Sequence, residues 1–291
     1  MSINHESTIG WAWRWFVGEL SECYEKQEAS AIGGEVFFRC LNLGSDQRVI
    51  RAGEGLAEQT LTMLQHTLGL LKQGMPVQYV TGITTFFDCE LEVCPGVLIP
   101  RPETEELVLW AASVYKKRTV DSGIRILDVG TGSGCIAIAL AKQLGHADVY
   151  ACDVSEIALD IARRNACNNK LDIHLFLCNV LEKGTGEAPL FDCVISNPPY
   201  VRFSEKMVMK PNVLAHEPEL ALFVEDDDPL KYFRAIANKA LMWLQPDGLI
   251  FFEINEALGA ETVKLIGDIG FTDITLKQDI HGKDRFVMGR K

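Results

Sequence analysis

The segment Ser196-Asn197-Pro198-Pro199-Tyr200 combines residue types that could activate a weakly nucleophilic nitrogen. The lone pair of an amide or aromatic amine is delocalised, so the nitrogen must be held along the sulfonium–methyl axis of a donor with its N–H bonds engaged. Asn197 could accept one N–H through its side-chain oxygen, and Pro198 could accept the other through its carbonyl. Pro199 stiffens the turn, and Tyr200 offers a flat face to a planar group. We expect catalysis by Asn197, Pro198 and Tyr200, and substrate binding by Asn197 through Tyr200.

A glycine-rich segment follows a strand-like run and opens a helical one. Glycines let the backbone turn sharply and approach a ligand closely. The spacing G-x-G-x-G differs from the G-x-G-x-x-G of dinucleotide sites and, after an acidic residue, favours S-adenosylmethionine. The residues expected to hold the amino-acid end and ribose side of this cofactor are Asp128, Gly130, Thr131, Gly132, Ser133 and Gly134.

Two more strand ends could complete the cofactor site. Asp153 could accept both ribose hydroxyls, with the alternative that it only caps the helix beginning near Ser155. Asn179 could pair with the exocyclic amine of adenine, and Val180 could supply its backbone amide. A plain strand-end turn remains an alternative for Asn179 and Val180.

The chain up to about Gly74 has helical periodicity. Trp13, Phe16, Val17 and Leu20 lie on one helical face, as do four leucines between residues 61 and 71. We therefore expect residues 1–74 to form a small all-helical domain. Two short β-prone stretches, punctuated by Pro95-Gly96, predict a β-hairpin linker over residues 75–101, followed by a larger domain over residues 102–291.

In this larger domain, strand-like and helical runs alternate, which is typical of a doubly wound α/β fold. A final hairpin, with strands at 274–277 and 285–288, adds an antiparallel strand, so we expect a mostly parallel seven-stranded sheet. The remaining strands are predicted at 125–129, 148–152, 173–178, 191–196 and 249–253, and helices at 134–144, 155–168, 229–244 and 257–268.

The stretch from Val201 to Asp228 lacks clear periodicity and carries two prolines and an acidic run. An irregular connection of this length in a compact domain is more often a lid or binding loop than a passive link. Because it directly follows Tyr200, we expect it to border the catalytic site.

Composition narrows the function classes. Forty acidic and 28 basic residues give a formal net charge of −12, and no dense basic run is present, so direct nucleic-acid binding is not expected. The nine cysteines include no C-x-x-C pair, which favours reduced thiols and no metal. No secretory signal or membrane span is visible. We expect a cytoplasmic monomer.

Taken together, these motifs resemble the HemK-type family of peptide-chain release factor glutamine methyltransferases over nearly the whole chain. The N-P-P-Y element alone is shared with methyltransferases of adenine, and its combination with I-P-R-P-E-T-E is far more specific. The segments that carry the resemblance are Pro76 to Gly82 (PVQYVTG), Leu98 to Glu105 (LIPRPETE), Asp128 to Gly134 (DVGTGSG), Ser196 to Tyr200 (SNPPY), Glu217 to Leu222 (EPELAL) and Gly270 through Arg290.

The resemblance implies a two-domain, Rossmann-like class I enzyme that transfers a methyl group from S-adenosylmethionine to the side-chain amide nitrogen of glutamine in the Gly-Gly-Gln motif of class 1 release factors, leaving S-adenosylhomocysteine. It assigns cofactor binding to Gly130 through Gly134, Asp153 and Asn197, and release-factor docking to the helical domain. Many members have an acidic residue and an aromatic one where this chain has Asn179-Val180. No role is assigned to Arg101, Glu103, His216 or Glu217.

Two other functions fit part of the pattern. A nucleobase methyltransferase would use the same N-P-P-Y geometry with a flipped base on Tyr200, but it needs a basic groove that this acidic chain does not suggest. The non-enzymatic alternative is a cofactor-binding or translation-associated module that has lost catalysis. The presence of both Asn197 and the glycine loop argues against it, because a purely structural turn needs neither. Methylation of a release factor therefore remains the primary expectation.

Overall fold

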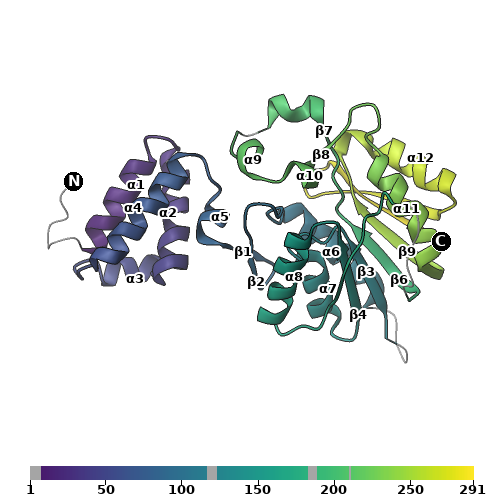
Figure 1. Cartoon of the computed structure of the whole chain (residues 1–291), viewed down its shortest axis with the longest axis horizontal. Helices are drawn as coiled ribbons and strands as arrows, with labels where there is room; N and C mark the ends of the chain where they lie inside the picture. Colours follow the sequence, from purple (N-terminus) through teal and green to yellow (C-terminus); the bar gives the residue numbers. More distant parts are fainter. Residues whose placement is uncertain (1–7, 117–122, 183–188, 210) are drawn as a thin grey trace. The chain divides into compact units, whose positions relative to one another are not determined.

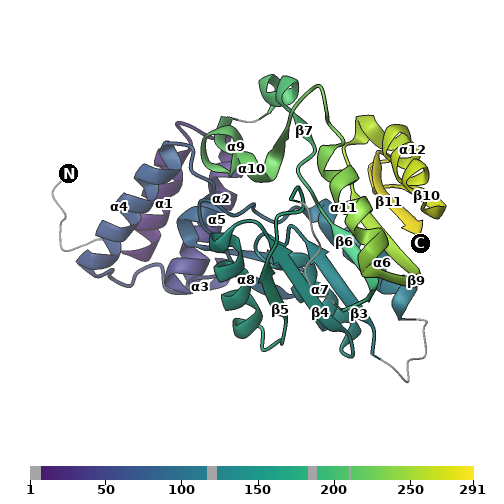
Figure 2. The ribbon, with the colours of Figure 1, turned by 45° about the vertical axis from the view of Figure 1, so that its right-hand side comes forward.

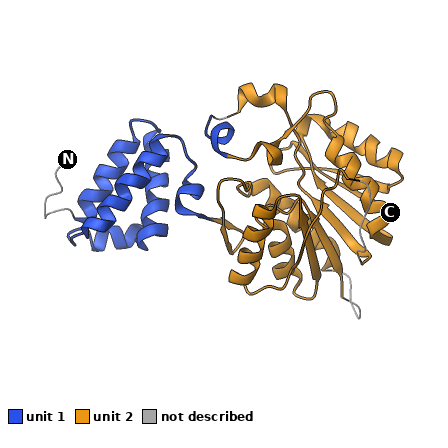
Figure 3. Ribbon diagram, viewed as in Figure 1, with its two compact units in different colours: residues 1–83, 210–216 blue, residues 84–209, 217–291 orange. Residues whose placement is uncertain are grey.

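A computed structural model describes residues 8–116, 123–182, 189–209 and 211–291. Its contacts divide the chain into two compact units (Figure 3). Unit 1 comprises residues 1–83 and 210–216, and unit 2 comprises residues 84–209 and 217–291. The first unit therefore contains a short segment from the predicted irregular connection as well as the N-terminal region.

Unit 1 is helical, as the spacing of its apolar residues predicts. Thr8 caps the first helix by accepting a hydrogen bond from the Trp11 amide at 3.2 Å, and Phe16 packs edge-on against Phe37 with ring centroids 5.8 Å apart. Both phenylalanines are fully buried. The helices are α1 (Ile9–Leu20), α2 (Lys26–Leu41), α3 (Ser45–Ile50), α4 (Glu58–Lys72), α5 (Val77–Thr81) and α9 (Pro211–His216).

Unit 2 is built on a seven-stranded sheet with strand order β10-β11-β9-β6-β3-β4-β5. Strands β9, β6, β3, β4 and β5 run parallel, and β11 joins β9 and β10 antiparallel. The predicted doubly wound sheet and terminal hairpin are therefore confirmed. The seven strands are β3 (Arg125–Val129), β4 (Asp148–Asp153), β5 (His174–Leu177), β6 (Phe191–Ser196), β9 (Leu244–Glu253), β10 (Thr272–Gln278) and β11 (Asp284–Arg290).

Helices cover both faces of this sheet (Figures 1 and 2). Ile126 packs with α6, α7 and α8 on one face, whereas its neighbour Leu127 packs with α11 and α12 on the other. Because successive side chains of a strand point to opposite faces, the nearly continuous apolar strands can fill both cores. These helices are α6 (Pro102–Tyr115), α7 (Cys135–Leu144), α8 (Glu156–Asn168), α11 (Lys231–Trp243) and α12 (Gly259–Ile269).

The smaller elements lie around this sandwich. The predicted β-hairpin is present as β1 (Ile83–Phe86) and β2 (Cys89–Glu92), although the segment that we assigned to the linker begins with helix α5. The predicted irregular stretch contains only short pieces, and two of them pair as parallel strands. Those in unit 2 are β7 (Val201–Arg202), the 3₁₀ helix η1 (Phe203–Val208), α10 (Glu219–Leu222) and β8 (Phe223–Val224), and a second 3₁₀ helix, η2 (Glu256–Leu258), precedes α12.

Helix α6 was absent from our sequence prediction, although its sequence carries a clear start. Pro102 is its first residue, Glu103 and Glu105 lie in its first turn, and Leu107 and Ala111 fall on its buried face. Strand β9 also begins earlier than predicted, at Leu244, because an irregularity in its pairing with β6 accommodates the polar turn before Leu249.

Candidate active site

A cavity of about 270 Å³ lies in unit 2 at the carboxyl ends of β3, β4, β5 and β6. Open parallel sheets bind ligands at this edge, because the strands end there and the helices begin. The structure brings ten of the predicted site residues to its wall: Gly130, Thr131, Gly132, Ser133, Asp153, Asn179, Val180, Asn197, Pro198 and Pro199. The other three, Asp128, Gly134 and Tyr200, lie outside the lining.

The glycine loop turns tightly between β3 and α7. The backbone amides of Gly130 and Thr131 both donate to the Cys152 carbonyl, at 2.9 and 3.0 Å. Gly134 has a φ of 83°, and a Cβ there would lie 3.2 Å from the Cβ of Ala162 on α8. Glycine is therefore required at Gly134 both by the backbone conformation and by the close approach of α8.

The buried side chain of Asp128 contacts this loop from its interior side. Its Oδ2 accepts a hydrogen bond from the Thr131 hydroxyl at 2.6 Å, while its buried Oδ1 has no hydrogen-bond partner among the described residues. Burial raises the pKa of Asp128 to about 7, although the bond from Thr131 opposes the shift. Its contact with Thr131 thus shapes the cavity wall without Asp128 reaching the cavity itself.

Asp153 ends β4 and lines the cavity. Its Oδ2 accepts from the Gly132 amide and its Oδ1 from the Ser155 amide, both at 2.9 Å. The N-cap of α8 is Ser155, whose hydroxyl accepts from Ala158, so Asp153 is not the capping residue. Burial raises the pKa of the Asp153 carboxyl, and its unused lone pairs remain available to ligand hydroxyls.

Asn179 is engaged locally at the end of β5. Its side-chain oxygen accepts from the Leu181 amide at 3.0 Å, and its side-chain nitrogen donates to Glu182 at 3.1 Å. The neighbouring Val180 lines the cavity and packs against the core. Of the two, Val180 presents the apolar surface that a heterocyclic ring could contact.

The N-P-P-Y segment leaves β6 at the same edge. Ser196 secures the strand end by donating to the Val129 carbonyl at 2.6 Å. The Asn197 side-chain nitrogen donates to the Thr104 hydroxyl at 3.2 Å, and Thr104 also lines the cavity. Neither the Asn197 side-chain oxygen nor the Pro198 carbonyl receives a hydrogen bond from a described residue. Two acceptors are thus available side by side in the sequence, on two residues that line the cavity.

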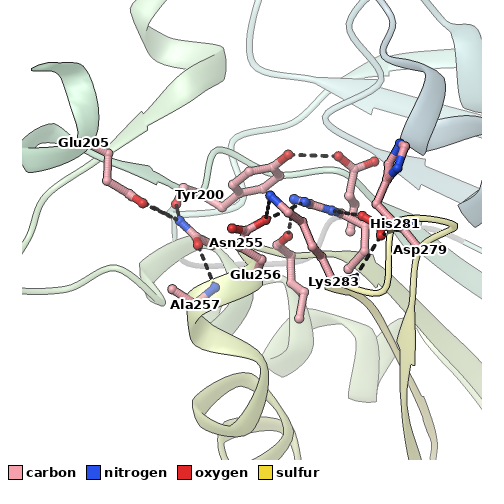
Figure 4. A network of polar contacts seen from close by, with 11 residues as sticks. Tyr200, Glu205, Asn255, Glu256, Ala257, Asp279, His281 and Lys283 are labelled. Carbon is pink, nitrogen blue, oxygen red and sulfur yellow. Dashed lines mark hydrogen bonds and ion pairs between the residues drawn. The ribbon is translucent and has the colours of Figure 1, made fainter. Parts of the chain in front are cut away.

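Tyr200 is held through its side-chain hydroxyl and its backbone carbonyl by residues at and just after the carboxyl end of β9. Its hydroxyl donates to Glu253 Oε1 at 2.9 Å, and its carbonyl accepts from the Asn255 amide group at 3.1 Å. Figure 4 shows Asn255 between Glu205 and Ala257, to which it is also hydrogen-bonded. Burial raises the pKa of the Tyr200 hydroxyl well above its ordinary value. The ring is therefore fixed by a network that the sequence analysis did not identify.

Glu253 and Thr104 are the site residues that sequence reasoning missed. Glu253 is 1% exposed, and its Oε2 accepts from the Thr104 hydroxyl at 2.7 Å. Burial raises the pKa of Glu253, whereas the hydrogen bonds from Thr104 and Tyr200 lower it. An acidic residue at the carboxyl end of an apolar strand was a visible indication, because buried carboxylates cluster at functional sites.

Arg101 and Glu217 form an ion pair beside the cavity. An Arg101 guanidinium nitrogen lies 2.8 Å from Glu217 Oε1, and the Glu217 side chain is only 1% exposed. Glu217 Oε2 also accepts from the Ile99 amide at 3.4 Å. This pair joins the I-P-R-P-E-T-E and E-P-E-L-A-L segments, which lie far apart in the sequence.

Helix α8 holds the hairpin and the glycine loop together through Asn165. The Asn165 side-chain nitrogen donates to the carbonyls of Glu92 and Ser133, both at 2.9 Å, and its oxygen accepts from the Glu92 amide at 2.6 Å. Asn165 is fully buried. A single side chain thus fixes the backbone on which Ser133 lines the cavity.

The residues around the cavity fit the donor that the sequence suggested. The Ser133 hydroxyl is buried without a hydrogen-bond partner among the described residues, next to a loop at the N-terminus of α7 that can receive a carboxylate. Asp153 offers acceptors for hydroxyls, and Val180 offers an apolar wall. In the part of the chain that the structure describes, no group of three or more metal-ligating side chains is found.

The fold defines the class of protein first. A crystallised methyltransferase from Pyrococcus furiosus superposes with a TM-score of 0.51 at 16% identity, covering 81% of this chain and 99% of that one. A Thermus thermophilus 16S rRNA methyltransferase gives 0.52 at 19% identity, covering 72% and 49%. Residues 112–217 match the family model "Methyltransferase small domain". Unit 2 therefore has the class I methyltransferase fold.

Closer relatives give the family. The chain is 40% identical to the release factor glutamine methyltransferase of Bacteroides thetaiotaomicron, over 94% of this chain and 96% of the relative. It is 48% identical to that of Flavobacterium psychrophilum, over 75% and 76%. The chain belongs to the release factor glutamine methyltransferase family.

No described helix has both the length and the apolar composition needed to span a bilayer.

Proposed function

We propose that this protein methylates the side-chain amide nitrogen of the glutamine in the Gly-Gly-Gln motif of class 1 release factors, with S-adenosylmethionine as donor. The observation that carries the proposal is the pair of unengaged acceptors on Asn197 and Pro198. A primary amide has two N–H bonds, and these two acceptors can engage both. The relatives in this family are release factor glutamine methyltransferases, and this supports a release factor as the substrate.

The donor would occupy the cavity between the glycine loop and Val180. The loop from Gly130 to Gly134 would bind its amino-acid end through backbone amides, and Asp153 would accept from its ribose hydroxyls. When bound, S-adenosylmethionine supplies an electrophilic methyl group. Asp128 would act indirectly, through Thr131, because it does not line the cavity.

Asn197 and Pro198 would orient the substrate nitrogen and fix its N–H bonds, which converts binding energy into alignment. No strong base is needed at the site, because the nitrogen becomes acidic as it gains the methyl group and can release its proton to water. Tyr200 would stiffen the segment through Glu253 and Asn255. Among the described residues that line the cavity, Arg101 is the one cation, and its ion pair with Glu217 makes it a poor partner for a phosphate.

The test is to incubate the purified protein with the donor and a class 1 release factor, and to measure methylation of the Gly-Gly-Gln peptide by mass spectrometry. We expect Asn197→Ala to lower kcat by about 100-fold, the usual loss when one preorganised contact is removed. The donor Kd, measured by calorimetry, should stay within about threefold of the wild-type value, since the contact that is lost is the one to the reacting amide.

The matched control is Asn238→Ala, which removes an exposed asparagine on α11 whose side-chain nitrogen donates to the Arg234 carbonyl of the same helix at 2.8 Å. It should methylate like the wild type. Methylated adenine in DNA or RNA, with the release factor unmodified, would overturn the substrate assignment in favour of nucleobase methylation.

A further inference from the structure

A buried carboxylate lies directly behind the N-P-P-Y segment. Glu253 is the last residue of β9, is 1% exposed, and forms no ion pair with a described residue. Burial of a carboxylate without a cation is unfavourable unless hydrogen bonds replace the lost water. Glu253 receives two such bonds, one on each oxygen, from Thr104 and Tyr200. Both carboxyl oxygens of Glu253 are therefore engaged by side chains of the N-P-P-Y and I-P-R-P-E-T-E segments.

The hydrogen bonds at Thr104 have a defined direction. A hydroxyl carries one proton, and Glu253 accepts hydrogen bonds on both carboxyl oxygens, from Thr104 and from Tyr200. The Thr104 proton therefore points to Glu253 Oε2, at 2.7 Å, and the Thr104 oxygen is left to accept from the Asn197 side-chain nitrogen, at 3.2 Å. Asn197 therefore donates to Thr104, and Thr104 in turn donates to Glu253.

This order selects one of the two orientations of the Asn197 amide. An asparagine side chain rotated by half a turn has nearly the same shape but exchanges its donor and acceptor ends. With the nitrogen on Thr104, the Asn197 oxygen is the end left unengaged at the cavity. With the amide reversed, its NH₂ group would face the substrate N–H, and two donors would oppose each other.

We infer that Glu253, acting through Thr104, is a positioning residue that sets the donor–acceptor orientation of the Asn197 amide for its methyl-accepting substrate. This inference rests on the proposed function, because it assigns the Asn197 oxygen to a substrate N–H. It gives a role to Thr104 of the I-P-R-P-E-T-E segment and to Glu253 at the carboxyl end of β9.

The decisive substitution is Glu253→Gln, which keeps shape and removes the second acceptor. A glutamine side chain has one acceptor oxygen and one NH₂ group, so it can accept from Thr104 or Tyr200 but not from both. When its NH₂ group faces Thr104, the Thr104 proton is released toward Asn197 and favours the reversed amide. In that arrangement the substitution alters the orientation of the Asn197 amide without opening a cavity.

The experiment uses the full chain, the donor and a class 1 release factor, and measures kcat, KM and donor affinity. We expect Glu253→Gln to lower kcat by about 30-fold or more, with KM and the donor Kd within about threefold, since the lost interaction orients only the reacting group. Thr104→Val, which removes the hydroxyl at constant shape, should lower kcat similarly. Thr104→Ser, which retains the hydroxyl, should restore most of it.

Because the two residues act in series, the double variant Glu253→Gln with Thr104→Val should lose little more than either single variant. The control is Glu256→Gln, three positions along the chain, whose carboxylate pairs with Lys283 and Arg285 and is partly exposed. It should have wild-type kcat. Thermal unfolding of every variant separates loss of fold from loss of orientation.

Three outcomes would overturn the inference: wild-type kcat in Glu253→Gln, failure of Thr104→Ser to restore the rate of Thr104→Val, or a multiplied loss in the double variant. Failure of the proposed function can be distinguished from failure of this inference, because the wild type itself would then leave the release factor unmodified. In that case the same variants are assayed on whichever amine the wild type methylates.

Discussion

At the scale of single residues, buried carboxyl groups arrange the candidate site. Asp128 and Glu253 both lie behind the cavity wall, and each accepts a hydrogen bond from a threonine that lines it, Thr131 or Thr104. Neither acid needs to touch a ligand to control how the wall is presented. Burial raises the pKa of both groups, because the charged form loses its contact with water.

Asp128 should make the stability of the ligand-free protein depend on pH. Its pKa of about 7 in the folded state exceeds the ordinary value of 3.8. The folded state thus binds a proton that the unfolded state has lost, so this contribution is fully present below pH 4 and disappears as pH rises through about 7. A shift of this size corresponds to roughly 4 kcal/mol.

In Asp128→Asn the free energy of unfolding should lose this part of its pH dependence, because the amide does not titrate. Urea unfolding from pH 4 to pH 8 measures the effect. Asp268→Asn serves as control, since the Asp268 carboxylate is exposed and pairs with Lys264 on the surface. If the unfolding free energies of wild type and Asp128→Asn stay parallel across this range, Asp128 does not titrate as described.

At the scale of elements, the cavity depends on contacts that tie a hairpin, a loop and a helix together. Asn165 on α8 satisfies backbone groups of Glu92 in β2 and of Ser133 in the glycine loop. The ion pair of Arg101 and Glu217 joins the segment before α6 to the segment before α10. The elements that meet at the cavity are thus fixed by polar side chains as well as by the apolar core.

Asn165→Ala should lower the free energy of unfolding by about 3 kcal/mol, because it removes hydrogen bonds to backbone groups of half-buried Glu92 and of buried Ser133. Donor affinity should also fall, since the backbone at Ser133 is no longer held. Chemical denaturation and calorimetry measure the two effects.

Asn168→Ala is the control on the same helix. Asn168 is exposed and donates to the Glu92 carboxylate at 2.8 Å in an exposed hydrogen bond, so its removal should change stability by less than about 0.5 kcal/mol. Equal losses in the two variants would contradict the role that we give to Asn165.

At the scale of the whole molecule, the chain contains separate hydrophobic cores. One cluster belongs to the helices of unit 1, and two others lie on the two faces of the sheet in unit 2. Each core can therefore be weakened by itself. We propose that the helical unit docks the release factor and that the sheet unit binds the donor.

Phe16→Ala, in the core of unit 1, should lower the stability of that unit by about 3 to 5 kcal/mol, because it deletes a fully buried ring. Donor binding should stay within about twofold, whereas KM for the release factor should rise. Phe233→Ala, in unit 2, is the counterpart and should weaken donor binding. Loss of donor binding in Phe16→Ala alone would show that the two functions do not divide in this way.

Much of the architecture was predictable because it depends on local patterns. The alternation of apolar runs gave the doubly wound sheet, and helical spacing gave the N-terminal helices. Helix α6 could also have been identified, since Pro102 and the acidic residues after it mark a helix start. The early start of β9 could not, because the irregular pairing of Leu244 with β6 is set by the neighbouring strand.

The sequence by itself determined the chemistry available here: an asparagine before two prolines, a glycine loop after an acid, and an acid at the end of the next strand. Only the tertiary structure decided which residues cooperate. Thr104, Asn197 and Glu253 come from three distant segments, and their order of donors and acceptors exists only once α6, β6 and β9 are packed together. The physical reason is that a hydrogen bond requires an approach of about 3 Å, and spacing along the chain does not encode that approach between segments that meet only in the folded state.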